Sequence, residues 1–243
     1  MPVFLETDRL RLRPFTAADA PHLLALDNDP EVMRYINGGR PVGADDIRER
    51  TLPRLLHDHP CTGTRGFWAA EEKATGTFLG WFELRPLADH DPAVVELGYR
   101  LNRASWGRGY ATEGARALIR KGFTDLGAER VTANTMAVNA ASRRVMEKAG
   151  LTFLRTYTEE WPDAIEGSEH GEVEYVLTRE EWGTGQHSAR GPGASEALGA
   201  AVVPGAPGAS GVPEALGASG ATEASAVSVV PRVPVASVVS VVP

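Results

Sequence analysis

Two short segments contain residue types and spacings that suit ligand binding. The first is Trp106-Gly-Arg-Gly-Tyr-Ala111, in which Gly107 and Gly109 lack Cβ atoms, so the backbone can approach a ligand closely. A helix is expected to begin at Tyr110, and its first amides, helped by the helix dipole, would face a phosphate or pyrophosphate. An ordinary glycine-containing connection explains this fragment equally well.

The second segment, Asn139-Ala-Ala-Ser142, stands at the head of another predicted helix. Asn139 is a natural N-cap, because its side chain can accept the amide hydrogen of Ser142. Ser142 shares a helix face with Val145, Met146 and Ala149, so its hydroxyl is expected to point into the interior. A buried hydroxyl needs a hydrogen-bond partner.

The elements that must position these segments follow from periodicity, capping residues and turns. Period-two alternation indicates strands, and apolar spacings of three and four with capping residues indicate helices. Strands are expected at residues 9–13, 66–71, 77–84, 94–101, 130–136, 152–158 and 172–177, and helices at 16–26, 29–35, 45–56, 110–126 and 139–149. This mixture of hairpins and crossover helices predicts an α+β (mixed α/β) domain around one sheet.

Taken together, the segments resemble the GNAT N-acetyltransferase superfamily, and within it the RimJ/RimL-like branch of ribosomal-protein N-terminal acetyltransferases. The resemblance covers residues 1–183 and rests on residues 5–13, 96–99, 106–113, 139–143, 147–151 and 175–182. It implies the GNAT fold, a single mixed sheet whose parallel strands at 94–101 and 130–136 splay apart around acetyl-CoA, the cosubstrate.

The resemblance also implies how the coenzyme is held. The amides of Gly107 to Thr112 would bind the pyrophosphate, the strand edge from Tyr99 to Leu101 would bond the pantetheine amides, and Asn139 would hold the pantetheine near its sulfur. Arg103 and Arg108 are expected to supply positive charge, since the loop begins with Trp106 rather than Gln or Arg. The coenzyme-binding residues implied are Tyr99, Arg100, Leu101, Trp106, Gly107, Arg108, Gly109, Tyr110, Ala111, Thr112, Asn139 and Ser142.

The implied reaction is direct transfer of an acetyl group to a primary amine, with a backbone amide of the splayed strand stabilising the oxyanion. Ser142 is the candidate acid that reprotonates the thiolate. Glu96 is the first candidate for the base and Glu83 the second. A strand carboxylate that faces solvent or pairs with an arginine explains either glutamate as well, and a water chain is another route for the proton.

The acceptor is expected to be an amine, either a protein N-terminus or a cationic small molecule. Five acidic residues and no Lys or Arg lie in the stretch 159–171, namely Glu159, Glu160, Asp163, Glu166 and Glu169. A solvated acidic loop is the default interpretation. The sharper one is a funnel that attracts a peptide N-terminus or a polyamine.

Composition excludes several other classes of partner and site. A formal net charge of −7 gives no bulk attraction for nucleic acid or an anionic membrane, so neither is expected. Cys61 is the only cysteine, which rules out an intrachain disulfide and a thiolate zinc site, and His57 and His59 complete no standard ligand spacing, so no metal is expected. Charges near the start and the lack of a long apolar run predict a cytoplasmic protein. Monomer and homodimer both stay open.

The chain is predicted to divide into a catalytic domain, residues 1–183, and a low-complexity tail, residues 184–243. In the tail, 49 of 60 residues are Gly, Ala, Val, Pro or Ser, and Phe, Trp and Tyr are absent. Such a segment cannot bury enough apolar surface to offset its ordering entropy, so the tail is predicted to be disordered.

Two alternative functions remain at this point. A dinucleotide-binding oxidoreductase would use the same glycines, with Glu129 about 20 residues later as the ribose-binding acid. However, Thr112 occupies the third glycine position, and Glu129 precedes a strand instead of ending one. The other alternative is a non-catalytic module that keeps the coenzyme pocket and acts through protein contacts.

Overall fold

The structure, a computed structural model, describes residues 3–158 and 164–189 and is built around one mixed sheet of eight strands. The strands are β1 (Leu5–Glu6), β2 (Leu10–Arg13), β3 (Phe67–Glu72), β4 (Phe78–Ala88), β5 (Asp91–Leu101), β6 (Arg130–Met136), β7 (Thr152–Tyr157) and β8 (Glu172–Thr178). Their order across the sheet is β1-β2-β3-β4-β5-β6-β8-β7. Among these neighbours β5 and β6 are parallel and the others antiparallel, which confirms the predicted α+β class.

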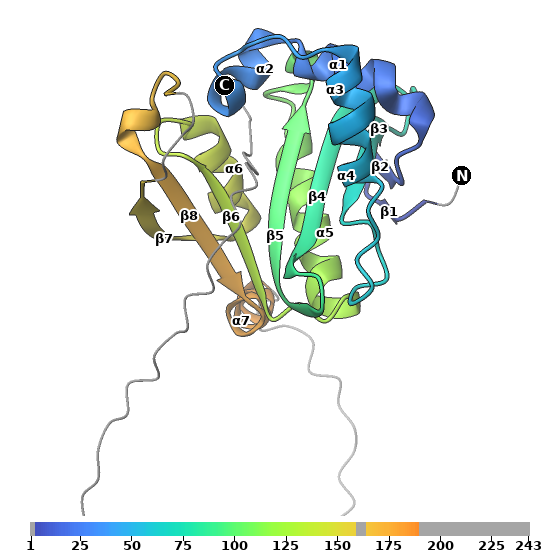
Figure 1. Cartoon of the computed structure of the whole chain (residues 1–243). Helices are drawn as coiled ribbons and strands as arrows, with labels where there is room; N and C mark the ends of the chain where they lie inside the picture. The colour runs from blue at the N-terminus through green and yellow to red at the C-terminus, as the bar shows by residue number, and fades with distance from the viewer. Residues whose placement is uncertain (1–2, 159–163, 190–243) are drawn as a thin grey trace, which may run out of the picture. The chain divides into compact units, whose positions relative to one another are not determined.

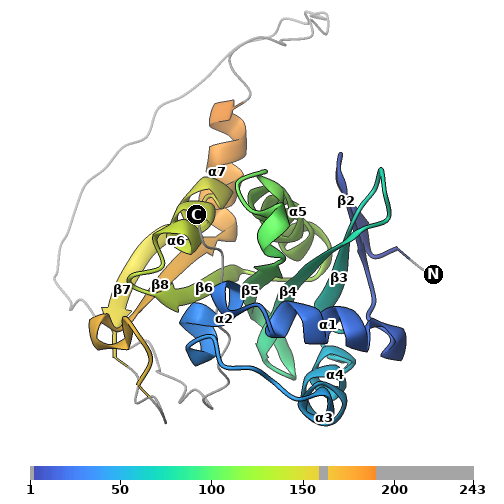
Figure 2. The same ribbon diagram turned by 90° about the horizontal axis from the view of Figure 1, so that it is seen from above.

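Helices cover both faces of the sheet. They are α1 (Ala20–Asp27), α2 (Pro30–Asn37), α3 (Ala44–Asp46), α4 (Leu52–Leu55), α5 (Tyr110–Asp125), α6 (Ala140–Ala149) and α7 (Arg179–Ala189). Figure 2 shows α5 and α6 over one face and α1 to α4 over the other. Short 3-10 turns lie at Ala17–Asp19, Arg103–Ser105 and Ser168–His170.

The core therefore has two parts, one on each side of the sheet. Phe82, Tyr99 and Leu118 belong to the part beneath α5 and α6, whereas Phe67 and Trp81 belong to the part beneath α1 to α4. From Val95 to Leu101 both faces of β5 are consequently buried, so the alternation of residues there separates two interiors and not an interior from solvent.

The predicted helix over residues 45–56 is interrupted in the structure. Between α3 and α4 lies a π-helical turn, Ile47–Thr51, in which the amide of Leu52 donates to the carbonyl of Ile47. Pro53 has no N–H to donate to the carbonyl of Glu49, which removes one α-helical hydrogen bond at this point. The proline accounts for the irregular turn.

The hairpin of β4 and β5 is longer than the sequence predicts. The strands expected at residues 77–84 and 94–101 leave residues 85–93 between them, yet Ala88 pairs with Asp91 and the turn consists of Asp89 and His90. A register shift between Pro86 and Ala88 accommodates the proline within the strand.

The end of the described region also differs from the expectation. Helix α7 begins at Arg179 and continues to Ala189, past the boundary predicted after Gly183. The remaining part of the predicted tail, residues 190–243, lies outside the described residues. Among the helices that are described, none is both long and apolar enough to cross a bilayer.

Candidate active site

The central feature of the site is the place where β5 and β6 separate. Their parallel pairing joins Val94 to Arg130, Val95 to Val131 and Glu96 to Thr132, and goes no further. Strand β5 nevertheless continues to Leu101, paired with β4, and β6 continues to Met136, paired with β8. Figure 1 shows the two strands adjacent at one end and apart at the other. The predicted splay is therefore present.

The glycine loop and the start of α5 lie next to this splay. Gly107 and Gly109 adopt φ values of 69° and 81°, a left-handed conformation that favours glycine. Gly109 is the N-cap of α5 and has no side chain to bind the first amides of the helix, those of Tyr110 to Thr112. A Cβ added to Gly107 would meet no atom within 4 Å, so this backbone borders open space. The loop thus fits a pyrophosphate.

A cavity of about 190 Å³ opens beside this loop, between the start of α5 and helix α6. Seven of the predicted coenzyme-binding residues line it: Leu101, Trp106, Gly107, Gly109, Tyr110, Ala111 and Thr112. Arg144 and Lys148 line it too, and the sequence analysis missed them. Arg144 and Lys148 are one helical turn apart and share a face of α6 with Ala141 and Val145. Their helical spacing could have indicated from the sequence that they line the same cavity.

The two arginines that were expected to supply charge are already paired with acids. The Nη2 atom of Arg108 lies 3.2 Å from Glu72, and the Nε atom of Arg103 lies 4.0 Å from Asp29. Arg144 and Lys148 are thus the cationic side chains that border the cavity itself.

The side chains at the end of β5 point to opposite faces of the sheet. The hydroxyl of Tyr99 is directed to α6, while the guanidinium of Arg100 binds Asp27 of α1 at 2.6 Å and stacks over the Trp81 ring. Only the backbone of Arg100 can therefore border the coenzyme gap. The indole nitrogen of Trp106 donates to the carbonyl of Leu101 at 2.9 Å, which ties the loop to the strand end.

The head of α6 has the arrangement that the sequence predicts. The side chain of Asn139 accepts the amide hydrogen of Ser142 at 3.1 Å, as an N-cap does. Ser142 is completely buried, and its hydroxyl lies 3.3 Å from the hydroxyl of Tyr99. Burial raises the pKa of Tyr99, so this phenol keeps its proton. The sequence analysis expected a hydrogen-bond partner for the buried serine without naming one, and the structure places Tyr99 of β5 there.

On the opposite face of the sheet, Glu83 and Glu96 share one arginine. The Nε atom of Arg85 donates to Glu83, and its Nη2 atom donates to Glu96. The side chain of Asn134 on β6 also donates to Glu96, at 2.9 Å. Both carboxylates are buried, with 1% and 4% exposure, and Glu96 is the last residue of β5 that pairs with β6. The sequence analysis gave pairing with an arginine as an alternative to a catalytic role, and both carboxylates are paired in this way. They also lie where β5 and β6 separate.

Burial strongly affects the acidity of Glu83. Loss of solvent, followed by the nearby charge of Glu96, raises the pKa of Glu83 to about 7, although Arg85 and Arg54 oppose the rise. Gly98 lies directly opposite Glu83 in the sheet, and a Cβ there would come within 2.6 Å of the carboxylate. Glycine at this position makes room for the buried acid, and sequence alone gave no sign of that contact.

Other residues singled out in the sequence lie apart from this site. Cys61 is in the segment between α4 and β3, where burial raises the pKa of its thiol, so it is a poor nucleophile. Of the acidic stretch, Glu159, Glu160 and Asp163 lie outside the described residues. Glu166 pairs with Arg34 of α2 at 2.9 Å.

A mixed sheet that splays its parallel strands beside a glycine loop and an uncapped helix start defines a coenzyme A-dependent acyltransferase domain. The Acetyltransferase (GNAT) domain model matches residues 9–152. The chain belongs to the GNAT acetyltransferase family, whose acyl donor is acetyl-CoA, and is an acyltransferase. This assignment rules out the dinucleotide-binding oxidoreductase.

Known proteins of this kind match most of the chain. The FsC-acetyl coenzyme A-N(2)-transacetylase of Aspergillus fumigatus is 38% identical over 185 residues, which are 73% of this chain and 77% of the relative. The solved spermidine N-acetyltransferase of Vibrio cholerae, in complex with CoA and spermine, superposes with a TM-score of 0.60 at 17% identity over 72% of this chain and 99% of its own. Aminoglycoside acetyltransferase AAC(6')-Ib, with coenzyme A and kanamycin, gives 0.57 at 21% identity over 73% and 99%. The two solved structures share the fold.

Proposed function

We propose that the protein transfers the acetyl group of acetyl-CoA directly to the primary amine of a small cationic acceptor. The observation that carries this proposal is the position of Glu83 and Glu96, buried at the point where β5 and β6 part and across the sheet from the glycine loop. A carboxylate there is placed to accept a proton from an amine bound at the gap.

Charge on the same face of the sheet supports a cationic acceptor. By register, Glu174 lies opposite Asn134 and Glu172 opposite Met136, so both glutamates are on the face that carries Glu96. Both are buried, and Glu174 pairs with Arg155 at 2.7 Å. Two structural neighbours were solved with small amines bound, one with spermine and the other with kanamycin, and an acceptor of this class would suit the acidic face.

A peptide N-terminus is the second candidate acceptor. It would place the protein in the RimJ/RimL-like branch, as the sequence segments around the glycine loop and α6 suggest. Acetyl transfer in either case would fit a cytoplasmic enzyme, in which a single cysteine stays reduced.

For the chemical step, we assign three roles to groups of this chain. Backbone amides at the end of β5 donate to the oxyanion, Glu96 takes the ammonium proton with Glu83 setting the local charge, and Ser142 returns a proton to sulfur. Tyr99 orients the Ser142 hydroxyl through their 3.3 Å contact. Ser142→Ala is expected to lower kcat while the Kd for acetyl-CoA stays near that of the wild type, and Tyr99→Phe is expected to lower kcat less.

The decisive experiment measures release of free thiol from acetyl-CoA in the presence of spermidine, kanamycin and short peptides with free N-termini, with mass spectrometry of each product. Acetylated polyamine or aminoglycoside supports the proposal. A product formed only from peptides supports the second candidate. Coenzyme binding without thiol release above hydrolysis for any acceptor identifies a non-catalytic binding module instead.

The catalytic domain is proposed to be residues 1–183, with residues 184–243 as a separate segment. Because α7 extends to Ala189, the truncation that tests this division removes residues 190–243. The truncated chain is expected to bind acetyl-CoA with an unchanged Kd, and a large loss of affinity would contradict the division.

A further inference from the structure

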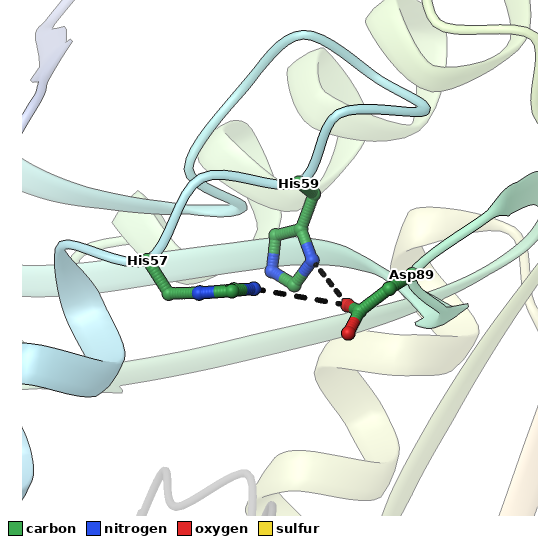
Figure 3. A group of neighbouring side chains, drawn as sticks. All are labelled: His57, His59 and Asp89. Atoms are coloured by element: carbon green, nitrogen blue, oxygen red, sulfur yellow. Dashed lines mark hydrogen bonds and ion pairs between the residues drawn. The ribbon is translucent and has the colours of Figure 1, made fainter.

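Three side chains that can ligate a metal meet at a place that the acetyl-transfer site does not use. His57 and His59 come from the segment after α4, and Asp89 comes from the turn between β4 and β5, as Figure 3 shows. One ligand atom from each residue lies within 4.8 Å of the others. His57 and His59 are two residues apart in the sequence, but Asp89 follows 30 residues after His59. Sequence spacing alone therefore did not reveal the group.

The separations within this group suit a small cation after a modest movement. The Nδ1 atom of His59 lies 3.0 Å from Oδ1 of Asp89, and the Nε2 atom of His57 lies 3.9 Å from the same oxygen. In a tetrahedral zinc site with bonds near 2.0–2.1 Å, ligand atoms are about 3.3 Å apart. The side chains of His57 and Asp89 are 55% and 71% exposed and have room for that adjustment.

The third ligand, His59, is fixed by its surroundings. Its side chain is only 7% exposed. Its amide donates to the carbonyl of Thr64 at 2.8 Å, and its own carbonyl accepts the amides of Thr62 and Gly63 at 3.1 and 3.0 Å. Asp89 is placed by the two-residue turn that the pairing of Ala88 with Asp91 closes. One imidazole and the backbone of the carboxylate residue are thus positioned before any ion binds.

We propose that His57, His59 and Asp89 form a binding site for a divalent transition metal of the zinc class. Two imidazoles and a carboxylate are ligands that such ions prefer, whereas Mg²⁺ and Ca²⁺ prefer oxygen ligands alone. Three protein ligands leave at least one position for water. The ion would crosslink the segment after α4 to the turn between β4 and β5. Its role is structural, and acetyl transfer does not depend on it.

The test uses the full chain, stripped with a chelator and free of any affinity tag. Titration with Zn²⁺ followed by calorimetry is expected to give one equivalent per chain, and Co²⁺ is expected to give the visible absorption of a tetrahedral complex. Added Zn²⁺ is expected to raise Tm, and the chelator to reverse the rise.

Variants locate the ion. Asp89→Asn and His59→Ala are each expected to weaken Zn²⁺ binding at least tenfold and to abolish the rise in Tm. Asp89 is exposed, so Asp89→Asn keeps the test valid if His59→Ala does not fold. Unchanged acetyl-CoA binding in the presence of chelator verifies the fold of each variant. His90→Ala, next to Asp89, and His170→Ala, elsewhere on the surface, are the matched controls.

Three results would overturn the proposal: less than one equivalent of Zn²⁺ bound to the wild type, wild-type affinity in Asp89→Asn, or equal loss in a control variant. Since acetyl transfer is assayed separately and in chelator, failure of the metal site leaves the proposed function untouched.

Discussion

The buried carboxyl of Glu83 makes a quantitative prediction about stability. Its pKa of about 7 in the folded protein compares with an ordinary value of 4.5, and the causes are burial first and the charge of Glu96 second. At about 1.4 kcal/mol per pKa unit, that difference corresponds to about 3 kcal/mol. Replacing the group by an uncharged side chain of the same shape, Glu83→Gln, removes this ionisation and keeps an acceptor for Arg85.

The sign follows from proton binding in the two states. Between pH 4.5 and 7 folded Glu83 holds a proton that it has released in the unfolded chain, so the unfolding free energy from this group falls as pH rises through that window. It should fall by about 3 kcal/mol in total and level off above pH 7. The variant lacks this fall.

The assay is urea unfolding of the wild type and Glu83→Gln at several pH values from 4.5 to 8. The free energy of the wild type minus that of the variant is expected to drop by about 3 kcal/mol across the series. The exposed residue Glu180 provides the control, since Glu180→Gln should show no such drop. A difference between wild type and Glu83→Gln that stays constant with pH would refute the reasoning, and with it the raised pKa of Glu83.

Three further predictions concern the site and its support. Glu96→Gln is expected to lower kcat for acetyl transfer by about 10²–10⁴ at pH 7, as for loss of a general base, and steady-state kinetics with an unchanged acetyl-CoA Kd would verify it; wild-type turnover would exclude this residue as the base. The double variant Arg144→Ala with Lys148→Ala is expected to weaken acetyl-CoA binding at least tenfold, measured by calorimetry, because these cations border the cavity. An unchanged affinity would mean that they do not contact the phosphates. Gly114→Ala is expected to destabilise the domain by about 1–3 kcal/mol in urea unfolding, since its Cβ would lie 2.3 Å from a buried aromatic ring. Gly183→Ala is the control: a Cβ added there meets no atom within 4 Å, and because Gly183 lies within α7 the change should stabilise by about 0.5–1 kcal/mol through helix propensity. Equal effects of the two glycine substitutions would contradict the packing argument.

Features that depend on neighbouring residues were predictable from the sequence. The N-cap at Asn139 follows from local chemistry and is present. The inward direction of Ser142 also followed from helical spacing.

Features that depend on the register between strands were not predictable. That Arg85 lies opposite Glu96, and Gly98 opposite Glu83, is a property of the pairing between β4 and β5. The strands expected at residues 77–84 and 94–101 are shorter than β4 and β5, because a register shift lets the pairing continue past Pro86. Because the sequence analysis did not predict the tip of this hairpin, it could not predict that Asp89 lies close to His57 and His59.

The brief parallel pairing of β5 and β6 has a consequence for amide hydrogen exchange. Three register pairs are the whole of the strand contact between the half of the sheet from β1 to β5 and the half made of β6, β7 and β8, among the residues described. Past Glu96, the amides of β5 that face the gap are no longer paired with β6 and should exchange with solvent much faster than those that face β4. Acetyl-CoA bound in the gap would protect these amides of β5 from exchange. Comparing exchange rates with and without the coenzyme would therefore show which residues of β5 it contacts.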